Sequence, residues 1–191
     1  NHAYMYGGPE QAIRAINQNF GLDIQDYVTV NFASMAKIVD AFGGVNIDLT
    51  EEEVEQININ MRDLAATSPD SMAGDVSTYA PLSAGEGVLL NGDEAVAYGR
   101  IRAIGNDNGR VERQQEVLSA LLSKASSVPK LEYPSIIQQL APLCETSLTF
   151  DKMIGLAQIA LTGFDIERLS IPSDVEGYAS DYCEGGGWMW T

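Results

Sequence analysis

The sequence predicts a single α/β layered domain. Short β-rich runs alternate along the chain with segments whose apolar residues recur at helical spacing, and Gly, Pro or capping residues bound both kinds. A chain of 191 residues can bury a hydrophobic core without a metal or a disulfide, and 45% hydrophobic with 20% charged residues is an ordinary globular composition. We therefore expect one domain over residues 1–191.

Helix signals recur along the chain. The expected helices cover residues 9–20, 35–42, 51–64, 91–98, 110–124, part of 129–142, and 150–162. Pro9 opens the first helix and Gly21 follows its end, Ser34 is expected to cap the second, and Thr50 with Glu53 forms a capping box before the third. The last helix is apolar nearly all round, which indicates either core packing or the wall of a lipid tunnel.

Strands are predicted over residues 27–32, 45–49 and 166–171. The tail over 184–191 is expected to turn and then to form an edge strand. Residues 65–87 are rich in Ser, Ala, Pro, Gly and Asp and show no periodicity, so we expect a long surface loop or insertion there.

The chain is strongly acidic, with 27 Asp and Glu against 11 Lys and Arg and a formal net charge of −16. Such a charge argues against a nucleic-acid-binding surface and against docking on anionic lipid. One His and two Cys are too few for a zinc site. The cysteines, Cys144 and Cys183, fit two buried thiols and one disulfide equally well.

Basic residues are nevertheless concentrated in one segment. Four of the seven arginines fall between Arg100 and Arg113. If Arg100-Ile101-Arg102 is extended, both guanidinium groups project to one face while Ile101 faces the core.

The residues that follow are expected to turn into a helix. The run GNDNG at 105–109 predicts a turn, and a helix beginning at Arg110 would place Arg110, Arg113 and Gln114 on one face of its first turn. Helix N-termini attract anions, and arginine pairs with phosphate oxygens through a planar fork. The segment therefore predicts an anion site, against the alternative of an ion-pair network of these arginines with Asp107, Glu112 and Glu116.

Three segments, in this order, resemble the LytR–CpsA–Psr family. NHAYMYGG at 1–8 resembles the family's N-H-A-Y-x-x-G-G segment, and YVTVNFASMAKIVDAFGGVNID at 27–48 resembles its strand–helix–G-G-V block. LNGDEAVAYGRIRAIGNDNGRVERQQ at 90–115 resembles its signature of R-x-R followed by D-x-x-R-x-x-R-Q. The resemblance covers most of the first 125 residues.

The resemblance implies a three-layer α/β/α sandwich around a mixed central sheet, on the extracytoplasmic face of a Gram-positive type of envelope. It implies a phosphotransferase that moves a glycopolymer, such as wall teichoic acid or capsular polysaccharide, from a polyprenyl pyrophosphate carrier to peptidoglycan. The alternatives are a non-catalytic polyprenyl-phosphate-binding module and a pyrophosphatase acting on the same lipid. The family's older label as a transcriptional attenuator is disfavoured by the charge of −16.

The resemblance also implies roles for individual residues. The expected pyrophosphate-binding residues are Arg100, Arg102, Arg113 and Gln114, and the expected catalytic residues are Asp107 and Arg110. Asp107 would act either as a base or by orienting Arg110. Because the family works outside the membrane, a disulfide between Cys144 and Cys183 becomes the favoured pairing.

In the family, the domain continues upstream of N-H-A-Y. An Asp-containing strand and an Arg-Asp segment lie there, and their acidic residues hold Mg²⁺. Neither piece is in this sequence. We therefore expect the Mg²⁺ ligands and a transmembrane anchor upstream, with no metal ligand in this chain, and we expect the 191 residues alone to transfer no glycopolymer.

Overall fold

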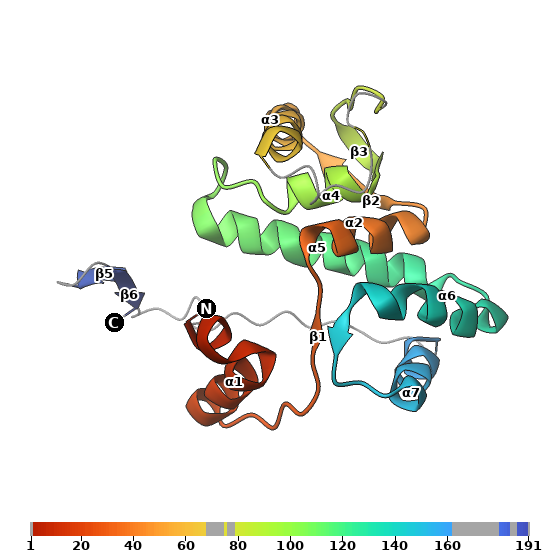
Figure 1. Ribbon diagram of the computed structural model, residues 1–191. Coiled ribbons are helices and arrows are strands. Elements are labelled where there is room, and N and C mark those ends of the chain that lie inside the picture. The colour runs from red at the N-terminus through yellow and green to blue at the C-terminus, as the bar shows by residue number, and fades with distance from the viewer. Residues whose placement is uncertain (1, 68–74, 76–78, 162–179, 184–186, 191) are drawn as a thin grey trace.

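A computed structural model describes residues 2–67, 75, 79–161, 180–183 and 187–190 (Figure 1). The α-helices are α1 (His2–Phe20), α2 (Phe32–Ala41), α3 (Glu51–Thr67), α4 (Gly92–Tyr98), α5 (Asn106–Ser126), α6 (Tyr133–Leu140) and α7 (Phe150–Leu161). The strands are β1 (Val28–Thr29), β2 (Val45–Leu49), β3 (Gly85–Leu90), β4 (Glu145–Thr146), β5 (Ser180–Cys183) and β6 (Gly187–Trp190). Two 3₁₀ helices, Lys130–Glu132 and Ala141–Leu143, flank α6.

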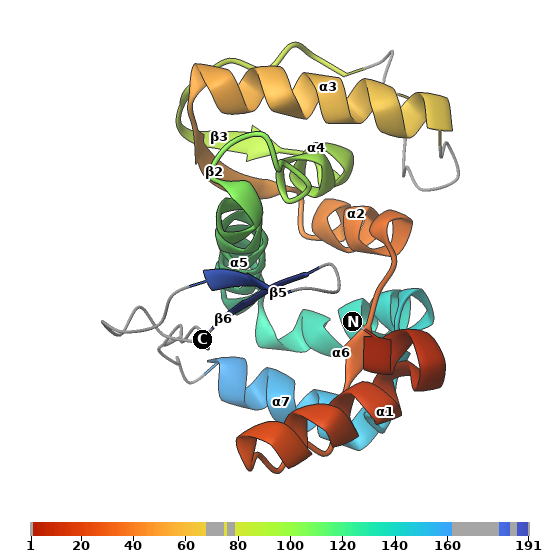
Figure 2. The ribbon, with the colours of Figure 1, turned by 90° about the vertical axis from the view of Figure 1, so that its left-hand side faces the viewer.

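The α/β class is confirmed. The described strands pair two by two and antiparallel, β1 with β4, β2 with β3 and β5 with β6, in place of the single mixed sheet that the family resemblance implies. In Figures 1 and 2, α5 lies below the β2–β3 pair, and in Figure 2 α3 lies above it. Helix α5 contacts β2 directly, whereas α3 packs chiefly against α4.

The hydrophobic core forms where β2, α2 and α4 meet α3 and α5. Along β2 the side chains alternate, with Val45, Ile47 and Leu49 buried and the two residues between them exposed. The largest fully buried side chains are Ile57, Leu90, Ile101, Val39 and Val45. Ile101 lies between the first two arginines of the cluster, so the core fixes the backbone from which both project.

Helices α2 and α4 approach each other closely at Gly92. A Cβ atom placed on Gly92 would lie 2.0 Å from the carbonyl oxygen of Ala36, so only glycine fits there. The Gly92 amide donates to Asp40 Oδ1 at 2.7 Å. Asn91 caps α4 through a reciprocal capping box with Glu94. These contacts hold α4, and the arginine-bearing loop that follows it, against α2.

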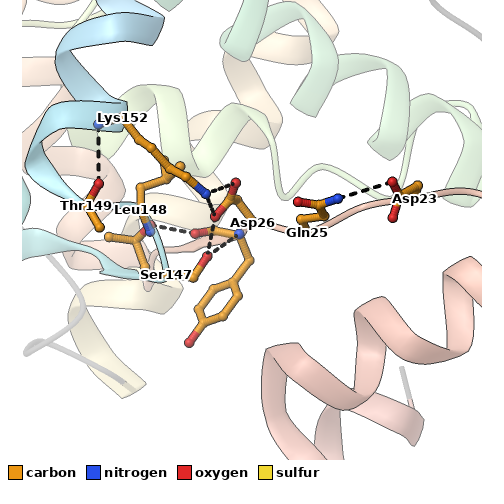
Figure 3. Close-up of polar contacts among 9 residues, drawn as sticks. Asp23, Gln25, Asp26, Ser147, Leu148, Thr149 and Lys152 are labelled. Carbon is orange, nitrogen blue, oxygen red and sulfur yellow. Dashed lines mark hydrogen bonds and ion pairs between the residues drawn. The ribbon is translucent and has the colours of Figure 1, made fainter.

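A second group of elements, α1, α6, α7 and the β1–β4 pair, lies below α5 in Figures 1 and 2. Lys152 Nζ on α7 forms an ion pair with Asp26 at 2.9 Å, just before β1 (Figure 3). Ser147 Oγ accepts the amide of Tyr27 at 3.0 Å. Helix α1 kinks at Gly7–Gly8 and begins at His2, earlier than its predicted start at Pro9.

Several predicted elements are confirmed. Strand β2 covers the predicted residues 45–49, α4 ends at Tyr98 as expected, and Thr50 with Glu53 forms the expected capping box. The tail contains a strand, β6, paired with β5. The strand predicted over 166–171 lies outside the described residues.

Other predicted boundaries are wrong. Asn31, not Ser34, caps α2, because the Asn31 side chain accepts the Ser34 amide at 2.8 Å. The strand predicted over 27–32 is only β1, since Phe32 already begins α2. The predicted loop over 65–87 is shorter at both ends, because α3 continues to Thr67 and β3 starts at Gly85.

Candidate functional site: an arginine cavity

The arginine cluster lies on the loop between α4 and α5 and on α5 itself. Arg100 and Arg102 are exposed on either side of buried Ile101, as predicted, but in a turn and an irregular segment rather than a strand. The turn predicted over 105–109 is wrong, because α5 begins at Asn106. Gly105 precedes the helix with a left-handed φ of 73°. Arg110 therefore lies about one turn inside α5 and not in its first turn.

These side chains meet in a cavity of about 500 Å³, called here the arginine cavity. Its lining consists of Phe32, Gln56, Asn60, Arg100, Arg102, Ala103, Arg110 and Gln114. The lining residues thus carry three guanidinium groups and three side-chain amides, and none of these eight residues is acidic. In a chain with a net charge of −16, this cavity is a local concentration of positive charge.

Packing and hydrogen bonds fix several of the lining side chains. The Arg100 guanidinium carbon lies 4.5 Å from the centroid of the Phe32 ring, a cation–π contact. Gln114 Nε2 donates to the Gly99 carbonyl at 3.1 Å, and Asn60 Nδ2 donates to the Ala97 carbonyl at 2.9 Å. Both amides are therefore tied to the end of α4 and the loop after it, which holds α3 and α5 in place around the cavity.

Arg113 is placed differently from the other arginines. Its side chain is 9% exposed and does not line the arginine cavity. Arg113 Nε donates to Glu53 Oε1 at 2.9 Å, and Nη1 donates to the Ile104 carbonyl at 2.9 Å. Its guanidinium carbon lies 5.8 Å from the Tyr98 ring centroid. The predicted face of three residues is thus divided: Arg110 and Gln114 reach the cavity, and Arg113 lies behind it.

The partner of Arg113 is an ionised carboxylate. Burial alone would raise the pKa of Glu53, but hydrogen bonds from the Thr50 amide, Arg113 and the Thr50 hydroxyl together lower it below its ordinary value of 4.5. Glu53 also completes the capping box of α3. One side chain therefore serves both the start of α3 and the ion pair with α5.

The alternative of an ion-pair network can be compared only with the described side chains. Arg113 is paired with Glu53, and Glu116 accepts the Tyr98 hydroxyl at 2.7 Å. Glu53 was absent from the network that the sequence suggested, since it lies 60 residues from Arg113. The side chain of Asp107 lies outside the described residues, so its role as base or orienting residue stays a prediction.

Besides Ala103, which lies within the arginine segment, sequence reasoning missed three lining residues, Phe32, Gln56 and Asn60. Gln56 and Asn60 are four residues apart in α3, so their shared face was a usable signal. Phe32 gave no signal, because it looked like the end of a strand. All three come from elements distant in sequence from the arginines.

Among the described residues, no group of three or more His, Cys, Asp and Glu is arranged to hold a metal ion. None of the helices within the described ranges is long and apolar enough to cross a bilayer. Cys144 forms no disulfide with any side chain that the structure describes, and burial raises the pKa of its thiol in this form. The Cys183 side chain lies outside the described residues, so the disulfide stays a prediction.

The family model named LytR_cpsA_psr matches residues 1–189. The chain belongs to the LytR–CpsA–Psr family. Membership confirms the resemblance that the three motif segments indicated, and it extends the match over the part of the chain beyond residue 125.

Several curated relatives of this LytR–CpsA–Psr chain are named teichoic acid transferases. This chain is 29% identical over 178 residues to the polyisoprenyl-teichoic acid–peptidoglycan teichoic acid transferase TagV of Bacillus subtilis. The match covers 90% of this chain and 41% of TagV. The chain is 28% identical over 160 residues to the transferase TagU of Enterococcus faecalis, covering 82% of this chain and 45% of TagU. The chain spans about half the length of the curated relatives it matches.

Solved structures agree in fold. The structure described as TagT bound to LIIa-WTA superposes with a TM-score of 0.64 at 25% identity, covering 84% of this chain and 54% of that one. The crystal structure of B. subtilis TagT superposes with a TM-score of 0.70 at 23% identity, covering 99% of this chain and 63% of that one. The second likeness bears on the fold alone.

Proposed function

We propose that this chain is the transferase domain of a cell-envelope phosphotransferase that moves a glycopolymer from a polyprenyl pyrophosphate carrier to peptidoglycan. The observation that carries the proposal is the arginine cavity: Arg100, Arg102 and Arg110 with no acidic lining residue, in a chain of net charge −16. Relatives named teichoic acid transferases, and a structural neighbour described as TagT bound to LIIa-WTA, support this class of substrate.

The chemistry follows from the cavity. The acceptor hydroxyl oxygen attacks the phosphorus that bears the glycan, the bond from that phosphorus to the bridging oxygen breaks, and polyprenyl monophosphate leaves. The hydroxyl proton passes to a base or to water, and a phosphodiester joins glycan to acceptor. Guanidinium groups of Arg100, Arg102 and Arg110 stabilise charge on the phosphate oxygens, which is the main need in phosphoryl transfer.

Each cavity residue has a distinct part in this scheme. The arginines bind the two phosphates through bidentate hydrogen bonds. The side chains of Gln56, Asn60 and Gln114 supply neutral hydrogen-bonding groups next to the charge. We place the enzyme at the outer face of the membrane, where both lipid carrier and peptidoglycan lie. Mg²⁺ remains part of the proposal as a charge-neutralising cofactor, and no residue described here is assigned to it.

The deciding experiment is turnover of a polyprenyl pyrophosphate-linked glycan by the full-length protein, with and without a peptidoglycan acceptor. Attachment of glycan to the acceptor with release of polyprenyl monophosphate is expected. Hydrolysis to polyprenyl monophosphate and glycan phosphate that does not depend on the acceptor would instead indicate a pyrophosphatase. Binding of the lipid without turnover would indicate a non-catalytic binding module.

A pair of matched substitutions tests the cavity itself. Arg110→Lys keeps the charge but loses the bidentate fork, so pyrophosphate should bind roughly tenfold more weakly. Arg62→Lys makes the same change on the exposed side of α3, outside the cavity lining, and should leave binding unchanged. Equal affinity of the Arg110→Lys variant and the parent would contradict the proposal.

A further inference from the structure

Arg113 does not itself line the arginine cavity, but its contacts connect three elements that surround the cavity. It projects from α5, donates to Glu53 at the start of α3, and donates to the Ile104 carbonyl in the loop that carries Arg100 and Arg102. Its guanidinium carbon also lies 5.8 Å from the Tyr98 ring centroid at the end of α4. The fork geometry of arginine lets one side chain make these contacts at once.

The contacts of Arg113 reach the residues that line the cavity. Ile104 lies two residues after Arg102, and Glu53 lies one helical turn before Gln56 in α3. Arg110 and Gln114 flank Arg113 on α5. The parts of the cavity wall formed by α3, by α5 and by the loop that carries Arg100 and Arg102 are therefore all linked to Arg113.

The chain leaves space for this arrangement at Gly109. A Cβ atom built on Gly109 would lie 2.8 Å from the Ile104 carbonyl oxygen and 3.2 Å from Arg113 Nη1. Both are the atoms that form the Arg113–Ile104 hydrogen bond, at 2.9 Å. A glycine inside a helix normally costs stability relative to alanine. Its presence here is explained by the close approach of the loop to α5.

The charge of Arg113 is already neutralised. Glu53 lies 2.9 Å away, the pair is largely buried, and the pKa of Glu53 is lowered despite burial. Turning Arg113 toward a phosphate in the cavity would break its pair with Glu53 and remove the counter-charge of a largely buried carboxylate, which is unfavourable.

We infer that Arg113 is a positioning residue, locked by Glu53, which holds the Arg100–Arg102 loop and α3 at the spacing that pyrophosphate binding requires, and that it does not bind the phosphates itself. This inference rests on the proposed function of the arginine cavity. It divides the arginines of the signature segment into three that contact the anion and one that sets their geometry.

The two possible roles of Arg113 predict opposite effects of Glu53→Gln. If Arg113 binds the anion directly, removing the competing carboxylate frees a cation and removes a repulsive charge, so pyrophosphate should bind more tightly. If Arg113 is a positioning residue, the same substitution loosens the lock and binding weakens. Gln retains the reciprocal capping hydrogen bond of α3, which limits damage to the helix start.

The experiment is calorimetric titration of the full-length protein with inorganic pyrophosphate, well below the melting temperature of every variant. Arg113→Lys and Glu53→Gln should each weaken binding by roughly tenfold, and the double variant should bind no more weakly than either, because coupled residues of one network are non-additive. A residue that supports only global stability would lower the melting temperature without changing this affinity.

The chain offers a matched control for removal of an ion pair. Lys152→Met removes the Lys152–Asp26 pair, which has the same 2.9 Å separation but lies between α7 and the segment before β1 (Figure 3). Its affinity for pyrophosphate should equal that of the parent. Tighter or unchanged binding by the Glu53→Gln variant would overturn the inference. Failure of the parent itself to bind pyrophosphate would overturn both the inference and the proposed function.

Discussion

Replacing Gly109 by alanine tests whether the loop and α5 are joined as closely as described. The new Cβ atom would lie 2.8 Å from the Ile104 carbonyl oxygen, a distance that forces the loop or the helix to move. It would also lie 3.2 Å from Arg113 Nη1. The substitution therefore separates the donor and acceptor of one buried hydrogen bond.

The size of the effect follows from two opposing contributions. A hydrogen bond to a charged group contributes about 1.5–3 kcal/mol. Alanine in place of glycine inside a helix stabilises it by about 1 kcal/mol. The net expectation is a loss of about 0.5–2 kcal/mol, which corresponds to a fall of roughly 1–8 °C in melting temperature for a chain of this size.

Gly155→Ala is the control, because it makes the same change in α7 where nothing lies within 4 Å of the new Cβ atom. It should stabilise the protein by about 0.5–1 kcal/mol. Calorimetric unfolding of the two variants should therefore give shifts of opposite sign, and Gly109→Ala should also weaken pyrophosphate binding. A Gly109→Ala variant as stable as Gly155→Ala would refute the reasoning.

Three further outcomes are expected. Burial, together with the charges of Asp40 and Asp93, raises the pKa of Glu94 above 4.5. The contribution of Glu94 to stability is therefore full below pH 4.5 and is lost as the pH rises through the raised pKa. The Glu94→Gln variant should melt a few degrees higher than the parent at pH 8 and show no advantage at pH 4. Asn31→Ala should cost about 1 kcal/mol of unfolding free energy because it removes the cap of α2, whereas Ser34→Ala should change it by less than about 0.5 kcal/mol, as measured by denaturant unfolding. Thiol labelling of the denatured, unreduced protein should find no free thiol at Cys144 or Cys183, and two free thiols per chain would exclude the predicted disulfide.

Features set by neighbours in the sequence could be predicted well. The capping box at Thr50–Glu53 joins residues three apart, and the alternation along β2 follows from a single buried face. Errors arose where two local signals competed. Asn31 and Ser34 are both good capping residues, and only the path of the chain before α2 decides between them.

The start of α5 is a second such case. The run GNDNG looked like a turn because of its two glycines, but only Gly105 takes a left-handed conformation. Glycine is required at position 109 because the Ile104 carbonyl approaches it closely. No local sequence pattern predicts this contact between loop and helix. Strand β3 was not predicted at all, for a related reason, since Gly85 and Gly87 resembled loop residues.

In the candidate site too, contacts between residues close in the sequence could be predicted and contacts between distant residues could not. The sequence spacing was enough to predict that one cavity contains Arg100, Arg102, Arg110 and Gln114, because they lie close together in the sequence. The separate role of Arg113 could not be predicted, since its partner Glu53 lies 60 residues away and is brought to it by the packing of α3.

The contrast between the cavity and the rest of the chain affects how fast an anion arrives. A molecule with a net charge of −16 repels an anionic headgroup at long range, although the three arginines attract it at contact. Salt shortens the Debye length to about 8 Å at physiological ionic strength, so it screens the distant repulsion more effectively than the close ion pairs. Raising the salt concentration should therefore speed the encounter while also speeding release, so the rate of association and the lifetime of the complex move in opposite directions.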